Sequence, residues 1–146
     1  MKLEVESAVN FIIHILRLSE NKISESKLSK FKSRLKIILC ERYMQRTWDP
    51  NKPDKGRFWR MITNNHIGLD PSILKAGQQC GINKAYFVES FPEILQISVN
   101  PGDVTYSINN SGIHVLYEYN ENNTKAWEPK YRVDVEKRKR KFCCIV

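Results

Sequence analysis

Apolar residues recur at three- and four-residue spacing near the start of the chain and predict two long amphipathic helices. One apolar stripe runs from Val5 to Leu16 and the other from Leu28 to Leu39. Ser24 stands where the second helix should begin, and its hydroxyl suits an N-cap. The first third of the chain is therefore predicted to be helical.

Two shorter helices are predicted further on by their boundary residues. Asp70 suits an N-cap, Pro71 suits the first helical position, and Gly81 suits the end of the same helix. Asn83 suits the N-cap of the next short helix. We expect these helices to begin and end close to these residues.

After Pro92 the pattern changes to the two-residue alternation of β-strands. Residues 95–100 and 104–108 alternate in this way, and the turn 109–112 leads into a third run at 113–119, which predicts a hairpin. An earlier piece, residues 58–63, is predicted to be a further strand. Gln96, Ser98 and Asn100 share one strand face, which we expect to point to solvent or to a partner.

These elements predict an α+β fold, with a helical layer of about four to five helices packed on a small, mainly antiparallel β-sheet. We place one domain at residues 1–120. The polar run Glu121-Asn122-Asn123-Thr124 opens a tail at 121–146 that we predict to be flexible and basic.

Composition is that of a globular protein, with 41% apolar and 27% charged residues. No apolar run reaches the ~18 residues that cross a bilayer, and the N-terminal residues do not have the pattern of a signal peptide. The four cysteines form no disulfide framework and no zinc-binding pattern. We therefore expect a protein of the cytoplasm and nucleus that needs no cofactor or metal.

The net charge of +8 is unevenly distributed. Residues 1–120 hold 16 Lys and Arg against 12 Asp and Glu, and residues 121–146 hold 8 against 4, so each part carries +4. The excess in the tail is concentrated in Lys137-Arg138-Lys139-Arg140-Lys141. The domain itself is only mildly basic, which weakens, but keeps open, the alternative of a nucleic-acid-binding domain.

Motifs of catalysis are missing from the sequence. It has no phosphate-binding glycine loop, no nucleophile elbow and no metalloprotease motif, and its three histidines lie in different predicted elements. We predict that the protein is not an enzyme and has no small-molecule substrate, although a site assembled from distant residues is beyond motif inspection.

Two segments combine aromatic, proline and basic residues in a distinctive order. The first is Leu39-Cys40-Glu41-Arg42-Tyr43 followed by Trp48-Asp49-Pro50-Asn51-Lys52-Pro53-Asp54-Lys55-Gly56-Arg57-Phe58-Trp59-Arg60. The second is Phe91-Pro92-Glu93-Ile94-Leu95-Gln96-Ile97-Ser98-Val99-Asn100-Pro101-Gly102-Asp103-Val104-Thr105-Tyr106. These segments resemble the two signature boxes of the BTG/Tob antiproliferative family, and the likeness extends in order and spacing from about residue 5 to residue 119.

This resemblance implies an adaptor that binds a Caf-type deadenylase subunit of the CCR–NOT complex and so promotes mRNA deadenylation and translational repression. Carried onto this sequence, the two boxes give partner-binding candidates at Phe58, Trp59, Arg60, Gln96, Ser98, Asn100 and Pro101. The sequence departs from the family pattern where Trp59 replaces a Tyr, and where Ser98 and Asn100 replace a Trp and an Asp. Loss of the indole removes a residue type that often dominates binding energy.

Aromatic residues near the first box can either pack in the core or contact a partner. Trp48 is expected to fill the core under the Pro-rich loop, since large aromatic side chains dominate core burial. For Trp59 the resemblance favours the partner surface. The neighbouring cations Lys52, Lys55, Arg57 and Arg60 are expected to be solvated, with nucleic-acid contact as the alternative.

The last four residues, Cys143-Cys144-Ile145-Val146, fit a C-a-a-X prenylation pattern directly after the basic run. A prenyl chain beside a polybasic segment is a two-signal membrane anchor. Cys143 is thus a lipidation candidate, and a membrane-tethered interaction module is a second alternative. A nuclear-localisation run with a chance C-terminus explains the same residues.

Overall fold

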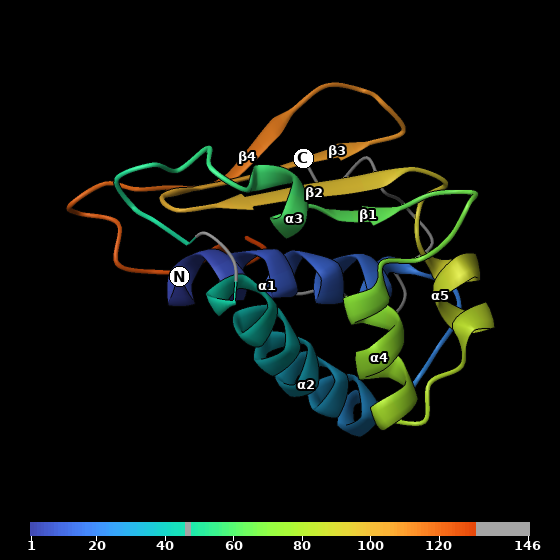
Figure 1. Ribbon diagram of the computed structural model, residues 1–146. Coiled ribbons are helices and arrows are strands. Elements are labelled where there is room, and N and C mark those ends of the chain that lie inside the picture. The colour runs from blue at the N-terminus through green and yellow to red at the C-terminus, as the bar shows by residue number, and fades with distance from the viewer. Residues whose placement is uncertain (46–47, 131–146) are drawn as a thin grey trace.

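The computed structural model describes residues 1–45 and 48–130, which form the predicted α+β fold (Figure 1). Within these residues the order of elements along the chain is α1 (Lys2–Leu18), α2 (Glu25–Met44), α3 (Arg57–Arg60), β1 (Ile62–Asn64), α4 (Pro71–Gln79), α5 (Lys84–Ser90), β2 (Leu95–Asn100), β3 (Asp103–Ile108) and β4 (His114–Glu118).

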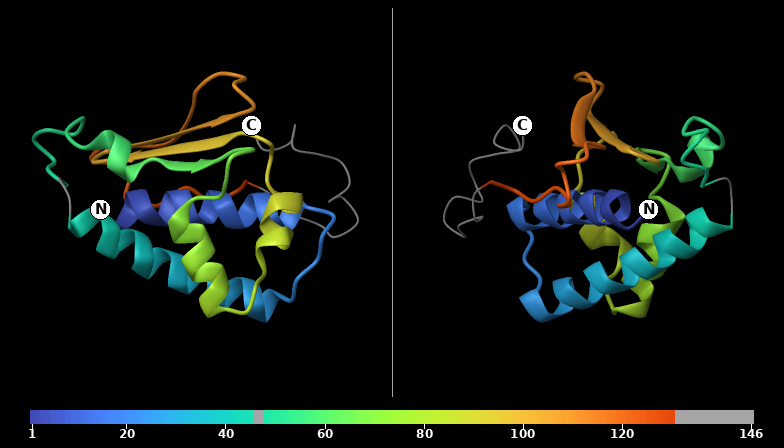
Figure 2. Two further views of the ribbon diagram at one scale, coloured as in Figure 1. Left: turned by 45° about the vertical axis from the view of Figure 1, so that its right-hand side comes forward. Right: turned by 90° about the vertical axis from the view of Figure 1, so that its left-hand side faces the viewer.

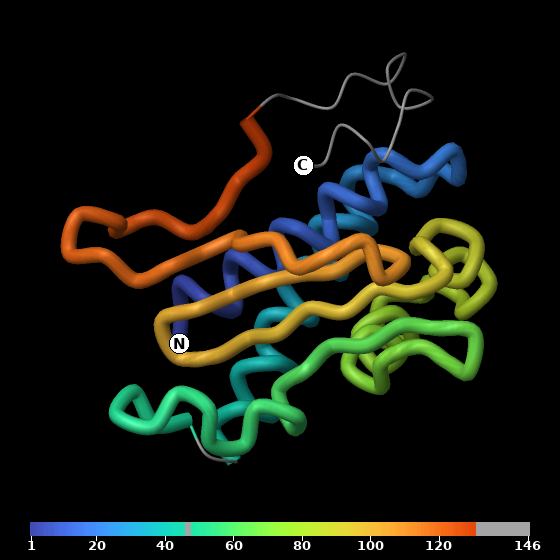
Figure 3. Tube along the Cα trace, turned by 90° about the horizontal axis from the view of Figure 1, so that it is seen from above, coloured from blue at the N-terminus to red at the C-terminus, as the bar shows by residue number. Residues whose placement is uncertain are grey.

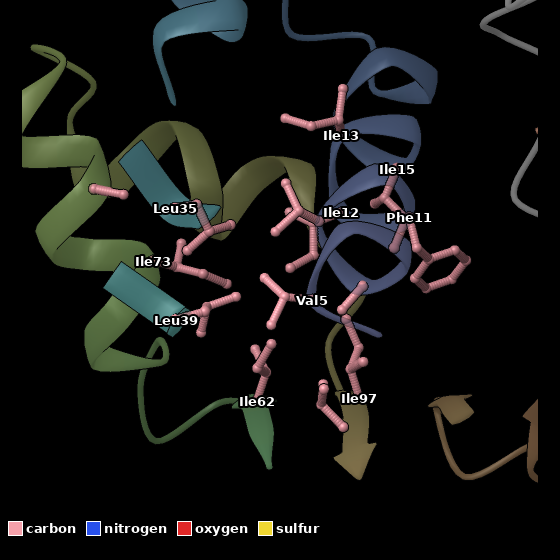
Figure 4. Close-up of a cluster of buried hydrophobic side chains, with 14 of the residues drawn as sticks. Val5, Phe11, Ile12, Ile13, Ile15, Leu35, Leu39, Ile62, Ile73 and Ile97 are labelled. Atoms are coloured by element: carbon pink, nitrogen blue, oxygen red, sulfur yellow. The ribbon is translucent and has the colours of Figure 1, made fainter. Parts of the chain in front are cut away.

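Helix α1 forms the centre of the molecule. It lies between the sheet on one side and helices α2 and α4 on the other (Figures 1 and 2). Figure 4 shows Val5 and Ile12 of α1 pointing into a cluster with side chains of α2, α4 and the sheet, among them Leu35, Ile73 and Ile97. Burial of this apolar cluster is the main driving force for the fold.

The four strands form one antiparallel sheet in the order β1-β2-β3-β4. Ile97 of β2 pairs with Ile62 on one side and with Tyr106 on the other, and all three side chains are buried. Seen from above, the strands run across the helical layer (Figure 3). Side chains on the inner face of the sheet therefore share one core with the helices.

The three predicted N-caps are confirmed. The side chain of Ser24 accepts a hydrogen bond from the Lys27 backbone N–H at 3.1 Å. Asp70 accepts one from Ser72 at 2.9 Å, and Asn83 accepts one from Tyr86 at 3.0 Å. Each cap satisfies a backbone donor that has no partner within its own helix.

The predicted hairpin is confirmed as well. Asn109 and Asn110 adopt left-handed φ angles of 51° and 59° at the centre of a turn that the Ser111 N–H closes by donating to the Ile108 carbonyl at 3.0 Å. Asn109 also accepts a hydrogen bond from the Ile94 backbone N–H at 3.0 Å through its side chain. The turn is thereby fixed to the segment that precedes β2.

The prediction of a strand over residues 58–63 was wrong in its first half. Residues 57–60 form the short helix α3, and only Ile62–Asn64 form the strand β1. The chain turns at Gly56, whose φ of 76° lies in the left-handed region. The Arg57 N–H then bonds to the Asp54 carbonyl and the Trp59 N–H to the Gly56 carbonyl, which closes helical rather than extended structure.

The expectation that Gln96, Ser98 and Asn100 of β2 all face solvent or a partner was also wrong. Of these three residues, Gln96 alone is exposed. Ser98 is 8% exposed and Asn100 is 3% exposed. The Arg60 side chain lies over this end of β2 and hydrogen-bonds to it, and Asn100 donates a hydrogen bond to the Ser98 Oγ at 3.0 Å. Alternation along a strand predicts which residues share a face, but not whether another part of the chain covers that face.

Candidate partner-docking site

The buried guanidinium of Arg60 fastens helix α3 to the sheet. It is fully buried, and its Nε donates to the Val99 carbonyl at 2.9 Å while its Nη2 donates to the Asn100 Oδ1 at 2.9 Å. The same side chain also bonds back to the loop before α3, with Nη1 to the Lys55 carbonyl at 2.7 Å and Nη2 to the Pro53 carbonyl at 2.8 Å. One side chain therefore holds the loop, α3 and β2 together.

Burial lowers the pKa of the Arg60 guanidinium, because the charged form loses solvation. The adjacent hydrogen-bond acceptors compensate for this loss. A second tie comes from Tyr43, whose hydroxyl donates to the Arg60 carbonyl at 2.8 Å and whose pKa is raised by burial. Both polar groups are therefore part of the core under α3.

Arg42 of α2 also holds the C-terminal end of α3. Its Nε donates to the Trp59 carbonyl and its Nη2 to the Met61 carbonyl, both at 3.0 Å. Its Nη1 reaches the Asp70 carboxylate at 3.2 Å and the Ser72 hydroxyl at 3.1 Å. Arg42 thus ties α3 to the start of α4, and α3 is held from two sides.

Trp48 is half-buried and packs against the core beside the Pro-rich loop, which agrees in part with the predicted burial. Its ring stacks on Tyr43 with centroids 6.1 Å apart and an interplanar angle of 15°. The Arg60 guanidinium carbon lies 5.6 Å from the Trp48 ring centroid, within the range of a cation–π contact. This indole therefore supports the buried cation.

Two aromatic side chains project from the supported helix. Phe58 is 79% exposed and Trp59 is 60% exposed. The side chains of Lys52, Lys55 and Arg57 beside them are also exposed. We call Phe58, Trp59 and these three cations the docking face. Large aromatic residues on a rigid support are the kind of feature that dominates binding energy at protein interfaces.

The structure divides the predicted site residues into two groups. Phe58, Trp59 and Gln96 are exposed and Pro101 is partly exposed, so a partner can contact all four. Arg60, Ser98 and Asn100 are buried, so their expected exposure is corrected, and they can influence a partner only through the residues they position. The two signature boxes do adjoin in space, since Arg60 of the first box contacts Val99 and Asn100 of the second.

Sequence reasoning missed a contact within the predicted tail. The backbone N–H of Trp127 donates to the Ser7 Oγ at 2.8 Å, and the backbone carbonyl of Trp127 accepts from the Asn10 side chain at 2.8 Å. The indole packs edge-on against Phe11 and His14 of α1. An isolated tryptophan in a polar segment was the available signal, because a large aromatic side chain favours burial.

Residues 1–45 and 48–130 contain neither a membrane-spanning helix nor a cluster of metal ligands. No helix there has the length and apolar character of a membrane span. Within the same residues, no three His, Cys, Asp or Glu side chains are grouped as metal ligands. The basic run and Cys143 lie outside the residues that the structure describes.

The arrangement of five helices and a four-stranded antiparallel sheet is that of a BTG/Tob domain. The solved BTG/Tob domain of FOG-3 from C. elegans superimposes with a TM-score of 0.69 over 82% of this chain and 84% of that chain, at 23% sequence identity. At this identity the likeness shows the fold alone.

Sequence identity is higher to the BTG and Tob proteins of vertebrates than to FOG-3. The family model described as "BTG family" matches residues 1–118, and the chain belongs to this antiproliferative family. Human BTG2 is 36% identical over 116 residues, which cover 79% of this chain and 72% of BTG2. Human BTG1 is 38% identical over 116 residues, which cover 79% of this chain and 66% of BTG1. Human Tob1 is 35% identical over 127 residues, which cover 84% of this chain but only 35% of Tob1.

Proposed function

We propose that the protein is a non-enzymatic adaptor that binds a Caf-type deadenylase subunit of the CCR–NOT complex and promotes mRNA deadenylation and translational repression. Membership of the BTG family supports this function class. The observation that carries the proposal is the docking face, where Phe58 and Trp59 are exposed on a helix that Arg42 and Arg60 hold in place.

The hydrogen bonds of Arg42 and Arg60 around α3 give an energetic argument for a protein partner. Side chains that are ordered before binding lose less conformational entropy when the complex forms. Because Arg42 holds the C-terminal end of α3 and Arg60 ties the helix to β2 and to the loop before it, the two aromatic anchors need little further ordering of their backbone. An exposed aromatic pair on such a support suits a well-defined protein surface.

A capture experiment with a purified Caf-type deadenylase tests this proposal. The full chain should capture the enzyme at micromolar concentrations, and Trp59→Ala should weaken capture about tenfold or more, since one interface anchor is worth ~2 kcal/mol. Val88→Ala is the matched control, because Val88 is also 59% exposed but lies on α5. Failure of the unmodified chain to bind, or equal binding by Trp59→Ala, would show that this assignment is mistaken.

One feature of the docking face favours direct nucleic-acid binding as a second candidate. The exposed rings of Phe58 and Trp59 lie among Lys52, Lys55 and Arg57, and aromatic stacking beside cations is typical of single-strand binders. Binding to a single-stranded RNA through this face would fall steeply with salt and would be lost in Trp59→Ala. Binding that depends on residues 121–146 alone would instead indicate nonspecific attraction to the basic tail.

A further inference from the structure

A groove runs between α2 and the C-terminal end of α4. It has a volume of about 540 Å³ and is lined by residues of both helices, namely Ser29, Lys30, Ser33, Arg34, Ile37, Gln79 and Cys80. Helices α2 and α4 lie on the side of α1 away from the sheet (Figures 1 and 2). The groove is therefore a surface distinct from the docking face on α3.

The cations of this groove differ from two other cations of α2, which are paired with carboxylates. Lys36 pairs with Glu6 at 3.2 Å and Arg42 pairs with Asp70 at 3.2 Å. Lys30 and Arg34, one turn apart, are exposed, and neither forms an ion pair with any residue among 1–45 and 48–130. Their charges are open to an external anion.

An apolar side chain lies beside these cations. Ile37 is 49% exposed, and it follows Ser33 by one helical turn along the wall of the groove. The hydroxyls of Ser29 and Ser33 add hydrogen-bonding groups. The groove thus combines positive charge, polar groups and an aliphatic surface.

We propose that this groove binds an acidic segment of a partner protein, with carboxylates against Lys30 and Arg34 and an aliphatic side chain against Ile37. Charge complementarity selects an acidic occupant. It argues against residues 131–146 of this chain, which carry the basic run Lys137 to Lys141. None of the described residues that line the groove is an aromatic residue on which bases could stack, which favours a peptide over a nucleic acid.

This second surface goes beyond the deadenylase proposal and does not depend on it. A groove on the helical layer would leave Phe58 and Trp59 accessible while an acidic partner segment is bound. The two sites can therefore be tested separately.

The test uses the full chain, labelled with ¹⁵N, and the acidic peptide EDELEDLED as the probe. The amide resonances of Ser33, Ile37 and Gln79 should shift on titration and give one dissociation constant. Lys30→Glu/Arg34→Glu should weaken this binding at least about tenfold, because two attractions become repulsions. The variant EDESEDSED should also bind more weakly, since it lacks the aliphatic side chains.

Lys2→Glu/Lys125→Glu is the matched control, because it makes the same change in net charge at two exposed positions outside the groove. This control should retain both the shifts and the affinity. Equal loss in the control, shifts confined to residues 131–146, or tighter groove binding of a twelve-nucleotide oligouridylate would each overturn the proposal. Deadenylase capture by Lys30→Glu/Arg34→Glu reports on the α3 site alone, so failure of one proposal is distinguishable from failure of the other.

Discussion

Arg60 donates a hydrogen bond from Nη2 to the Oδ1 of Asn100 at 2.9 Å, and this contact joins helix α3 to the end of strand β2. Both side chains are buried. Two residues 40 positions apart in the sequence therefore hold α3, which carries Phe58 and Trp59, against the sheet. The exposed aromatic pair depends on this buried polar contact.

Truncation of Arg60 should loosen this support. Arg60→Ala leaves the carbonyls of Pro53, Lys55 and Val99 without this donor, and we expect a loss of roughly 3 kcal/mol in the free energy of unfolding, measured by urea titration. Arg57→Ala is the control, because Arg57 is exposed and should change stability by less than about 0.5 kcal/mol. A similar effect of the two substitutions would show that the Arg60 contacts contribute little.

Restoring the family residues in the second box should strengthen deadenylase capture. In Ser98→Trp/Asn100→Asp, the contact with Arg60 becomes an ion pair, and the indole, which is too large for the buried space of Ser98, is expected to project to the surface beside α3. We expect capture about tenfold tighter than that of the unmodified chain in a titration with the purified enzyme. Ser111→Trp, in the exposed hairpin turn, controls for a general effect of one more tryptophan. No gain over that control would count against a role of this strand in binding.

Removal of the Trp127 ring should destabilise the fold although the residue lies in the predicted tail. Trp127→Ala removes the edge-on contacts with Phe11 and His14, and we expect a loss of about 2 kcal/mol in thermal or urea unfolding. Trp59→Ala is a matched control, because that indole is 60% exposed and its loss should alter stability by less than about 0.5 kcal/mol. Equal stability of the two variants would mean that the segment around Trp127 does not stabilise α1.

His14 should make stability depend on pH. Burial, and then the charge of Arg17, lower the pKa of His14 below its ordinary value of 6.5. The unfolded chain therefore binds a proton more readily than the folded one. The stability contributed by neutral His14 is complete above about pH 6.5 and is lost as the pH falls toward the lower pKa of the folded state.

Thermal unfolding between pH 7.5 and 5 measures this effect. His14→Gln should flatten the decline in melting temperature on the acid side, whereas His66→Gln, at an exposed position, should leave it unchanged. The comparison concerns the slope, because the loss of a buried ring also lowers stability at every pH. An unchanged slope in His14→Gln would refute the assignment to this residue.

Prenylation of Cys143 remains a prediction from the sequence pattern. Intact mass spectrometry of the full chain from a eukaryotic cell should show a mass increase of one prenyl group with loss of the last three residues. Cys143→Ser should abolish this increase and shift the protein from the membrane fraction to the soluble fraction. An unmodified mass in the native cell would exclude the membrane-tethered alternative.

Elements with local signals could be predicted from the amino-acid sequence alone. The caps at Ser24, Asp70 and Asn83 and the turn at Asn109 each depend on a side chain and on backbone groups within a few residues, so their patterns can be read directly. The two boxes were likewise sufficient to indicate the family.

The exposure of the candidate site residues, in contrast, depends on contacts between distant segments of the chain. Arg60, Ser98 and Asn100 have side chains that usually face water, yet they are buried because the loop 48–56, α3 and β2 converge over them. The position of Trp127 on α1 depends on Ser7, 120 residues earlier in the chain. Burial is a property of the neighbours that folding brings together, and hydrophobic periodicity along one segment holds no information about a neighbour from another.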